Sequence, residues 1–476
     1  MAIILVVLGI MYSFNGVLFA IGFLFKGKKF KDTDKKYNYA VLIAARNEEK
    51  VIGQLIDSIR KQDYPAEKIT IFVVAHNCTD NTAAVAREQG AIVYELNNTP
   101  RKEHRKGYAL KFALDNIKAA YASETQPNGI KNFDGYFIFD ADNLIANNYI
   151  TEMNKAFDMP KYDWFTSYLS EKNINTRPVP SYSSLNLYTV NMVNSRPMSL
   201  IGCAVKARGR GSLIRSELLK NGWKWLSLLE DGQSGAYFTA RGHRSVFVES
   251  AELFDESTHT AKALFRQRMR WSKGAWYMFF TRFPMLVLGI IWPRRWRKDP
   301  DAAPTYKYTP TGKNAFTRGC KKVGFAILDG LQKRFSCYER ATAYFPMGAT
   351  GLIYGFLYPL GVALYTIISG DISGIKVAAI LVGTYYGGLY LGDLLRALAI
   401  IVRESKRIRC SIPRLIGCIF IWPFFTIFTA YLHLYVLFVP VKWKPIPHIQ
   451  DSQVEEMDRK TLASKFTEFV SGKQKT

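Results

Sequence analysis

Residues 135–142 read Gly-Tyr-Phe-Ile-Phe-Asp-Ala-Asp, an apolar run that ends in two aspartates separated by one residue. The run predicts a buried strand, and its end would place the carboxylates of Asp140 and Asp142 at the edge of a sheet. Two carboxylates at this spacing can share one hard divalent cation, Mg²⁺ or Mn²⁺, which would neutralise a diphosphate. The alternative is a solvated acidic turn, and the spacing alone would favour that alternative.

Strands and helices alternate before this run. Apolar stretches at 39–45, 69–75 and 91–96 predict strands, and the apolar spacing at 51–59 and 82–89 predicts the helices between them. Such alternation implies an α/β fold with a parallel sheet, whose ligands bind at the carboxyl ends of the strands. The polar turns that follow these strands are expected at that edge.

The chain has 476 residues, a length for two or three structural units, and a formal net charge of +25. Basic runs at 26–36, 294–298 and 403–409 flank apolar stretches, which is typical of cytoplasmic loops beside anionic lipid. We therefore expect the lipid bilayer, and no nucleic acid, as the partner of this charge. The six cysteines have no paired spacing, which predicts neither a zinc site nor a disulfide framework.

Long uncharged stretches predict membrane-spanning helices. The first lies in residues 1–26 and is followed by positive charge, so its N-terminus is expected outside the cell. Three more spans are expected at 344–369, 376–400 and 414–440. The predicted units are an N-terminal transmembrane helix (1–26), a cytosolic domain (37–276), interfacial helices and a loop (277–343), transmembrane helices (344–440) and a tail (441–476).

Two further segments are predicted to lie on the membrane surface. Residues 278–292 are apolar but interrupted by Arg282 and Pro284, and residues 323–345 are amphipathic and basic. Four spans would place the C-terminus outside, although lysines of the tail favour the inside. The sequence leaves open whether one span is re-entrant or broken. The tail lysines are Lys442, Lys444, Lys460 and Lys465.

Seven motifs follow one another along the chain. They are Ile43-Ala-Ala-Arg-Asn-Glu-Glu49, Gln62-Asp-Tyr-Pro65, Asn77-Cys-Thr-Asp-Asn-Thr82, Lys106-Gly-Tyr-Ala-Leu110, Asp140-Ala-Asp142, Leu229-Glu-Asp231 and Gln267-Arg-Met-Arg-Trp271. This series resembles the membrane-integrated polysaccharide synthases of glycosyltransferase family 2, which include cellulose, hyaluronan and chitin synthases. The resemblance covers most of residues 39–276. It implies a cytosolic GT-A-type domain that binds a nucleotide sugar at the plasma membrane.

Glu230 and Asp231 form the expected catalytic pair. An inverting transfer needs one carboxylate to remove the proton of the acceptor hydroxyl while the anomeric carbon is attacked. The resemblance implies that Asp231 is this base and that Glu230 supports the site. The alternative is an acidic helix start that favours the helix dipole.

Gln267, Arg270 and Trp271 are spaced to share one face of a helix. The resemblance implies that Arg270 and Gln267 meet the diphosphate and that Trp271 forms part of the acceptor platform. An arginine fork suits phosphate oxygens, and a flat aromatic face suits the C–H side of a sugar ring. The alternative is an amphipathic interfacial helix with basic neighbours.

The resemblance also implies the remaining donor and acceptor residues. Lys106 and Asp140 would contact the nucleotide end of the donor, and Arg208 and Gly209 would line the acceptor side. The nucleotide-binding set is completed by Ala45, Arg46, Glu48 and His76.

Two positions depart from the family pattern. Arg46 stands where Tyr or Asp is usual, and His76 replaces an Asp that typically contacts the base of UDP. UDP remains the expected nucleotide. His104, His243 and His259 are expected to be structural.

Asp393 and Arg396 lie late in the second C-terminal span, at helical spacing. Charges in such a place usually face protein or a watery path. A local ion pair is the first interpretation, and the lining of a glycan channel is the second.

Together these features predict a processive, inverting synthase that adds β-linked hexoses from a UDP-sugar, with UDP-glucose favoured, to a growing glycan. The same spans would translocate the polymer outward. The alternative is a non-processive enzyme that glycosylates a membrane lipid and needs no channel. A sugar-sensing pseudoenzyme is disfavoured because every acidic and arginine position needed for the chemistry is present. Any regulatory or export partner would be a separate chain.

Overall fold

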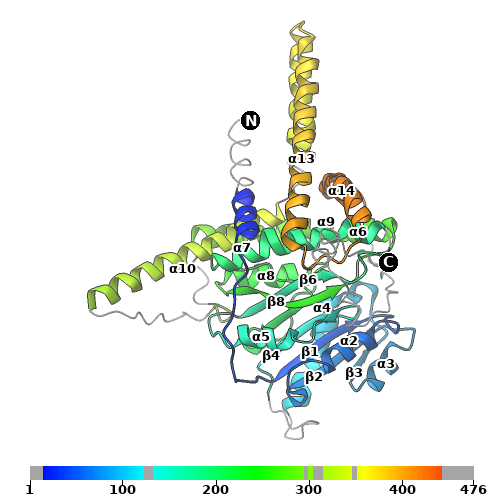
Figure 1. Ribbon diagram of the computed structural model, residues 1–476, viewed down its shortest axis with the longest axis vertical. Helices are drawn as coiled ribbons and strands as arrows, with labels where there is room; N and C mark the ends of the chain where they lie inside the picture. Colours follow the sequence, from blue (N-terminus) through cyan, green and yellow to red (C-terminus); the bar gives the residue numbers. More distant parts are fainter. Residues whose placement is uncertain are drawn as a thin grey trace, which may run out of the picture.

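The computed structural model describes residues 14–122, 132–176, 178–293, 299–303, 315–345 and 351–441. The start of the first predicted span (1–13), part of the second (346–350) and the tail with its lysines (442–476) lie outside the described residues. The described chain forms an eight-stranded sheet flanked by helices, with further long helices gathered on one side of it (Figure 1).

The sheet has the strand order β3-β2-β1-β4-β7-β6-β8-β5. In its first half β1 is parallel to β2 and β4, and β2 is parallel to β3, as predicted. In its second half β7 runs antiparallel to β4 and β6, a reversal that the sequence did not indicate. The strands are β1 (Tyr39–Ala45), β2 (Ile69–His76), β3 (Ile92–Leu96), β4 (Gly135–Asp140), β5 (Leu144–Ile145), β6 (Trp164–Glu171), β7 (Ser212–Arg215) and β8 (Ser245–Asp255).

β1 is buried on both faces, as expected of a central parallel strand. Val41 and Ile43 pack in one core with residues of α2 and α5, whereas Ala40 and Leu42 pack on the other face with residues of α4. Period-two alternation along the strand therefore builds two cores at once. The flanking helices are α2 (Ile52–Arg60), α3 (Thr82–Glu88), α4 (Lys106–Ala122) and α5 (Tyr149–Phe157).

The remaining helices gather on one side of the sheet. In Figure 1, α9 and α14 lie close against the domain, α10 extends sideways from it, and α13 rises well beyond it. These helices are α6 (Pro178–Thr189), the π-helix η3 (Val190–Ser195), α7 (Arg196–Leu200), α8 (Glu230–Ala240), α9 (Ala261–Ile291), α10 (Ala315–Tyr344), the π-helix η5 (Ile353–Leu357), α12 (Tyr358–Ile368), α13 (Ser373–Glu404) and α14 (Ile412–Phe438). Short 3-10 helices are η1 (Ala66–Lys68), η2 (Arg101–Glu103) and η4 (Ser216–Leu219).

Among the described residues, α9, α13 and α14 are long and apolar enough to cross a membrane, judged by length and composition. α13 contains the predicted span 376–400, and α14 covers the predicted span 414–440 except its last two residues. The segment 278–292, predicted to be interfacial, is the second half of α9, which also carries Gln267, Arg270 and Trp271. One continuous helix thus joins a predicted substrate site to an apolar segment.

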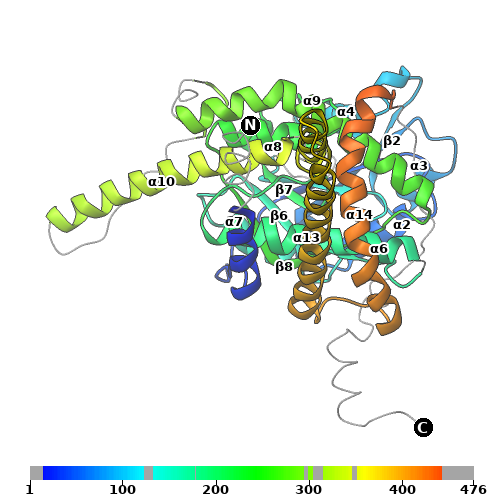
Figure 2. The same ribbon diagram turned by 90° about the horizontal axis from the view of Figure 1, so that it is seen from above.

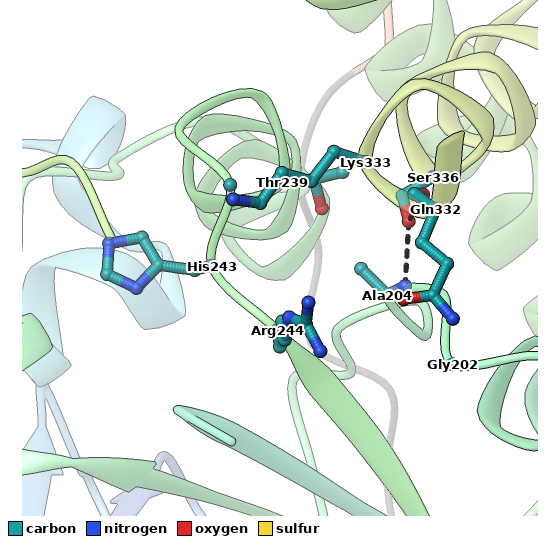
Figure 3. A pocket seen from close by; sticks show the side chains of 9 residues that line it. Gly202, Ala204, Thr239, His243, Arg244, Gln332, Lys333 and Ser336 are labelled. Carbon is teal, nitrogen blue, oxygen red and sulfur yellow. Dashed lines mark hydrogen bonds between the residues drawn. The ribbon is translucent and has the colours of Figure 1, made fainter. Parts of the chain in front are cut away.

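α10 docks on the domain through polar contacts around a cavity of about 10 Å³ (Figure 3). The Ala204 N–H donates to the Ser336 hydroxyl at 2.8 Å, and the Gln332 amide donates to the Ile201 carbonyl at 2.8 Å. A cavity of this size holds about one water molecule and no substrate. The contacts fix the C-terminal half of α10 against the loop that precedes β7.

Arg196 ties three distant parts of the chain together. Its buried guanidinium donates to the Gly22 carbonyl at 2.8 Å and forms two bonds with Glu249, at 2.6 and 2.9 Å. It also donates to Glu404, the last residue of α13, at 2.7 Å. Burial raises the pKa of Glu249, but the hydrogen bond and charge of Arg196 outweigh burial and hold that pKa below its usual range. The N-terminal helix that contains Gly22, strand β8 and helix α13 therefore all contact the Arg196 guanidinium.

We predict that Arg196→Met destabilises the protein by about 3–5 kcal/mol, because it removes the cation that pairs with the buried Glu404 and the partly buried Glu249. Thermal or denaturant unfolding in detergent measures the loss. Arg87→Met is the matched control, since Arg87 pairs with Glu95 at the surface and its loss should cost less than about 1 kcal/mol. Equal losses in the two variants would contradict the assignment.

Candidate active site

The carboxyl ends of β1, β2 and β4 open into a cavity of about 550 Å³. Its wall also includes residues of α8, α9 and α14. Every residue that the sequence singled out for the site lies in this wall. They are Ala45, Arg46, Glu48, His76, Lys106, Asp140, Asp142, Arg208, Gly209, Glu230, Asp231, Gln267, Arg270 and Trp271.

Asp140 ends β4, and the turn after it is held by Asn143. The Asp140 N–H donates to the Asn143 side-chain oxygen at 2.9 Å, and the Asn143 amide donates to Asp142 at 3.3 Å and to Asp255 at 2.9 Å. Lys106, at the start of α4, pairs with the Asp140 carboxylate. The Asp-x-Asp turn is thus ordered by an amide on one side and an ammonium on the other.

Asp140 and Asp142 fit a divalent cation that is shared with a substrate. Both side chains are hard oxygen donors in the cavity wall. Within the described residues no group of three His, Cys, Asp or Glu side chains is placed to hold a metal by itself. Mg²⁺ is usually held by one or two carboxylates together with substrate phosphates and water, which matches this donor set.

Asp231 lies in the first turn of α8 with both carboxylate oxygens oriented. The Gly209 N–H donates to one oxygen at 2.9 Å, and the Gly232 N–H donates to the other at 2.6 Å. Burial, and then the neighbouring charge of Asp231, raise the pKa of Glu230 to about 7. The two carboxyl groups of the pair therefore differ: Asp231 is anchored by backbone donors, whereas burial disfavours the ionised form of Glu230.

Gly209 permits the close approach between its loop and this acidic pair. A Cβ atom built on Gly209 would lie 3.1 Å from Glu230 Oε1 and 3.6 Å from the Asp231 side chain. The Gly209 carbonyl also accepts a hydrogen bond from Lys106 Nζ at 2.5 Å. The same short loop therefore contacts the predicted base and the lysine of the Asp-x-Asp turn.

Arg208 points into the domain. Its guanidinium donates to the Ser167 carbonyl and the Asn191 side chain at 3.1 Å, and to the Ser195 hydroxyl at 2.7 Å. Burial, with the charge of Arg210 as a second cause, lowers its pKa to about 9. Arg208 fixes the loop against the π-helix η3, and its contact with an acceptor stays a prediction.

α9 presents Gln267, Arg270 and Trp271 to the cavity, as the helical spacing predicts. Arg268, which the sequence marked only as a basic neighbour, places its guanidinium 4.7 Å from the centre of the Trp271 ring. The same guanidinium lies 5.1 Å from the Phe425 ring of α14. A cation between two aromatic rings restrains Trp271 in the wall.

His76 ends β2 at the edge where the base of the donor is expected. The Asn77 amide donates to the Thr99 hydroxyl at 2.6 Å, and the same hydroxyl shares a hydrogen bond of 3.2 Å with His76 Nε2. Burial, with His104 and Arg46 as further causes, lowers the pKa of His76 to about 4. His76 is therefore neutral at pH 7.

Several cavity residues have no sequence motif. His104, expected to be structural, lies in the wall and contacts the Thr99 carbonyl at 3.0 Å. The others come from loops, from the end of β8 and from helices that were assigned to the membrane. Only the three-dimensional structure shows that these residues line the cavity. They are Arg105, Lys206, Arg210, Asp255, Tyr344, Thr429 and His433.

A sheet edge that gathers an Asp-x-Asp turn, an acidic pair and an arginine-bearing helix around one cavity defines a GT-A-like glycosyltransferase. The family model described as Glycosyltransferase like family 2 matches residues 37–274, half of the chain. The chain therefore belongs to glycosyltransferase family 2 and transfers a sugar from a nucleotide sugar. The match confirms the predicted family and does not extend to the polysaccharide synthase subtype.

Curated relatives are distant. The chain is 22% identical over 267 residues to the beta-monoglucosyldiacylglycerol synthase of Synechocystis, covering 55% of this chain and 52% of the relative. It is 41% identical over 70 residues to the 4,4'-diaponeurosporenoate glycosyltransferase of Staphylococcus aureus, covering 14% of this chain and 18% of the relative. The chain thus spans about half the length of the first relative and less of the second.

Solved structures give a similar result. The mannosyltransferase PcManGT from Pyrobaculum calidifontis, solved with GDP-Man and Mn²⁺, has a TM-score of 0.44 and 17% identity, covering 80% of this chain and 98% of its own. TarS of S. aureus, residues 1–349, has a TM-score of 0.35 and 14% identity, covering 74% and 92%. Neither likeness identifies a substrate.

We predict that His76 makes the fold sensitive to acid. The unfolded chain binds a proton on this imidazole near pH 6.5, whereas the folded chain binds it only near pH 4. The free energy of unfolding should therefore fall as the pH falls from 6.5 to 4, by at most about 3 kcal/mol from this group. Unfolding midpoints measured across that window should fall less in His76→Gln, which keeps an acceptor for Thr99. An identical pH slope in both proteins would contradict the prediction.

Proposed function

We propose that the protein transfers a hexose, with inversion, from a UDP-sugar to a hydroxyl group of a membrane lipid, with UDP-glucose as the favoured donor. The observation that carries this proposal is the composition of the cavity wall. Asp231 and Arg270 line the cavity from the domain, and Thr429 and His433 line it from α14. A helix with an apolar outer face thus borders a cavity with a charged interior.

In the proposed reaction the Asp231 carboxylate accepts the proton of the acceptor hydroxyl while that oxygen attacks the anomeric carbon. The new C–O bond forms on the face opposite the breaking bond, and UDP leaves with the electron pair. Arg270 donates hydrogen bonds to the departing diphosphate. Mg²⁺ or Mn²⁺, when held by Asp140 and Asp142, would supply the further positive charge that neutralises the leaving group.

Asp231 is the better base of the acidic pair. Its two backbone hydrogen bonds hold both oxygens in place and leave a second lone pair on each for a proton. Burial, and then the charge of Asp231, raise the pKa of Glu230, so this carboxyl is less readily ionised than an exposed glutamate. We assign Glu230 to the support of the Gly209 loop.

The second candidate is processive polymerisation with translocation of the glycan. Trp271 in the cavity wall favours it, because an aromatic face can hold a sugar between additions. Asp393 does not support it: this carboxylate accepts from Arg396 at 2.7 Å and also from Thr426, which is the local ion-pair interpretation. Apolar side chains such as Ile380 and Leu391 are exposed along the described part of α13. We therefore rank lipid glycosylation first.

The relatives support the same ranking. The name beta-monoglucosyldiacylglycerol synthase describes a product with one glucosyl group on diacylglycerol, and this relative matches 55% of the chain. Single transfer to a lipid needs a cavity at the membrane and no polymer path. At 22% identity the sugar and the lipid stay part of the proposal.

The first test is product analysis with purified protein in nanodiscs. We expect a divalent cation to be required for UDP release from a UDP-sugar, and expect the label to appear as one sugar on extractable lipid. Chelation should abolish turnover, and added Mg²⁺ or Mn²⁺ should restore it. Long glycanase-sensitive product at early times would instead establish the polymerase, and no turnover with any nucleotide sugar would refute both.

A second test separates the base from the cation site. Asp231→Asn should lower kcat by about 10²–10⁴-fold and leave donor affinity nearly unchanged, because the phosphate side is intact. Asp142→Asn should weaken cation-dependent donor binding itself. Asp57→Asn, which changes an exposed residue paired with Lys61, is the matched control and should behave as the native protein. Loss of donor binding in Asp231→Asn, with binding kept in Asp142→Asn, would reverse the two roles.

A further inference from the structure

α14 packs against the domain along its whole length. At its start the Arg414 guanidinium donates to the Asn175 carbonyl, and near its end Lys273 of α9 donates to the Val436 carbonyl at 3.1 Å. Between them Trp422, 1% exposed, belongs to a buried core with Tyr168. In Figure 1 α14 stays close to the domain, and in Figure 2, seen from above, it runs lengthwise across it.

The middle of α14 meets polar parts of the domain. The Arg268 guanidinium stands over the Phe425 ring, and Thr429 and His433 line the active-site cavity. The Trp276 indole donates to the His433 carbonyl at 2.6 Å. The inner face of α14 is therefore the wall of a site that must hold charged substrates.

These contacts conflict with a membrane crossing. Residues 414–436 extend about 33 Å along a helix, which is about the full thickness of a bilayer core. If α14 crossed, Arg268 and the charged cavity would be carried to the middle of the hydrocarbon, where an ionised side chain is costly. A crossing by α13 would carry no such charged cavity into the hydrocarbon. Apart from Gly374, the buried residues of α13 lie near its C-terminal end.

The outer face of α14 carries an apolar stripe, one edge of which packs on Phe265 of α9, whose ring lies 6.2 Å from those of Phe428 and Tyr435. Its members are exposed by 48–63% and recur mostly at every fourth position, as one side of a helix requires. The stripe lies beside the base of α13, which contacts α14 through Tyr390 and Asp393. It consists of Ile416, Phe420, Phe424, Phe428 and Tyr435.

We infer that α14 lies in the plane of the membrane surface, with this stripe in the lipid and its inner face closing the active site. The bilayer is the partner that fits, because the stripe adjoins α13, whose apolar side chains such as Leu391, Leu395 and Leu398 are exposed. The chain then leaves the domain side through η5 and α12 and returns through α13. Residues after 440 lie on the side of the catalytic domain.

This arrangement removes the conflict over the tail. A crossing at 414–440 would export Lys442, Lys444, Lys460 and Lys465, whereas a surface helix keeps them inside. It goes beyond the proposed function, because it holds whichever sugar and acceptor react.

Depth measurement with spin labels tests the inference. Single cysteines replace Ile416, Phe420, Phe424, Phe428 and Tyr435 in the full chain, with the exposed Cys320 changed to Ser, in nanodiscs. Collision of the label with oxygen and with a water-soluble nickel chelate gives its depth. We expect one shallow depth for all five positions. A maximum at Phe424 with shallow ends would show a crossing helix and overturn the inference.

The exposed residues of α13 provide the matched control. Labels at Ile375, Ile380, Leu391, Leu398 and Val402 should pass through a depth maximum, because α13 is expected to cross. A reporter fused after residue 476 gives an independent measurement without substitutions. A fluorescent protein there should mature in the cytosol, and an export-dependent phosphatase there should stay inactive. An active phosphatase would place the tail outside and overturn the inference.

Discussion

The burial of one guanidinium, that of Arg196, sets how the catalytic domain sits on its apolar helices. Burying an ion is costly unless every donor is satisfied, and here the bonds come from Gly22, Glu249 and Glu404, which are far apart in sequence. Tyr168 completes the arrangement by donating to the other oxygen of Glu404 at 2.7 Å. The domain cannot tilt away from α13 without leaving charge unpaired. The position of the catalytic domain relative to α13 follows from this constraint.

Within the cavity, the side chains that are expected to contact substrates are held in place by neighbouring residues. Asn143 orders the Asp-x-Asp turn, backbone donors orient Asp231, and Arg268 restrains Trp271. Donor and acceptor groups of the proposed reaction thus lie on rigid elements that meet at one edge of the sheet. Such preorganisation is what proximity effects in a two-substrate transfer require.

How much of this could be predicted from the sequence depends on the range of the interaction. The parallel half of the sheet and the wall residues at strand ends follow from local periodicity and polar turns, as Asp140 and His76 show. The reversal at β7 could not be predicted, because register there depends on β4 and β6, which are remote in sequence. Thr429 and His433 were missed for a related reason. An apolar helix is predicted from the sequence to be a membrane span, and only its three-dimensional contacts show that it lines the cavity. Arg208 was assigned to the acceptor side by the family resemblance, and its inward hydrogen bonds are visible only in three dimensions.

Lys106 has a consequence for the two substrates. One ammonium joins the Asp140 carboxylate to the Gly209 carbonyl, and the N–H of that same glycine orients Asp231. A diphosphate bound at the Asp-x-Asp turn would compete for the Lys106 ammonium. Donor binding would then alter the contact of Lys106 with Gly209, the residue that orients Asp231.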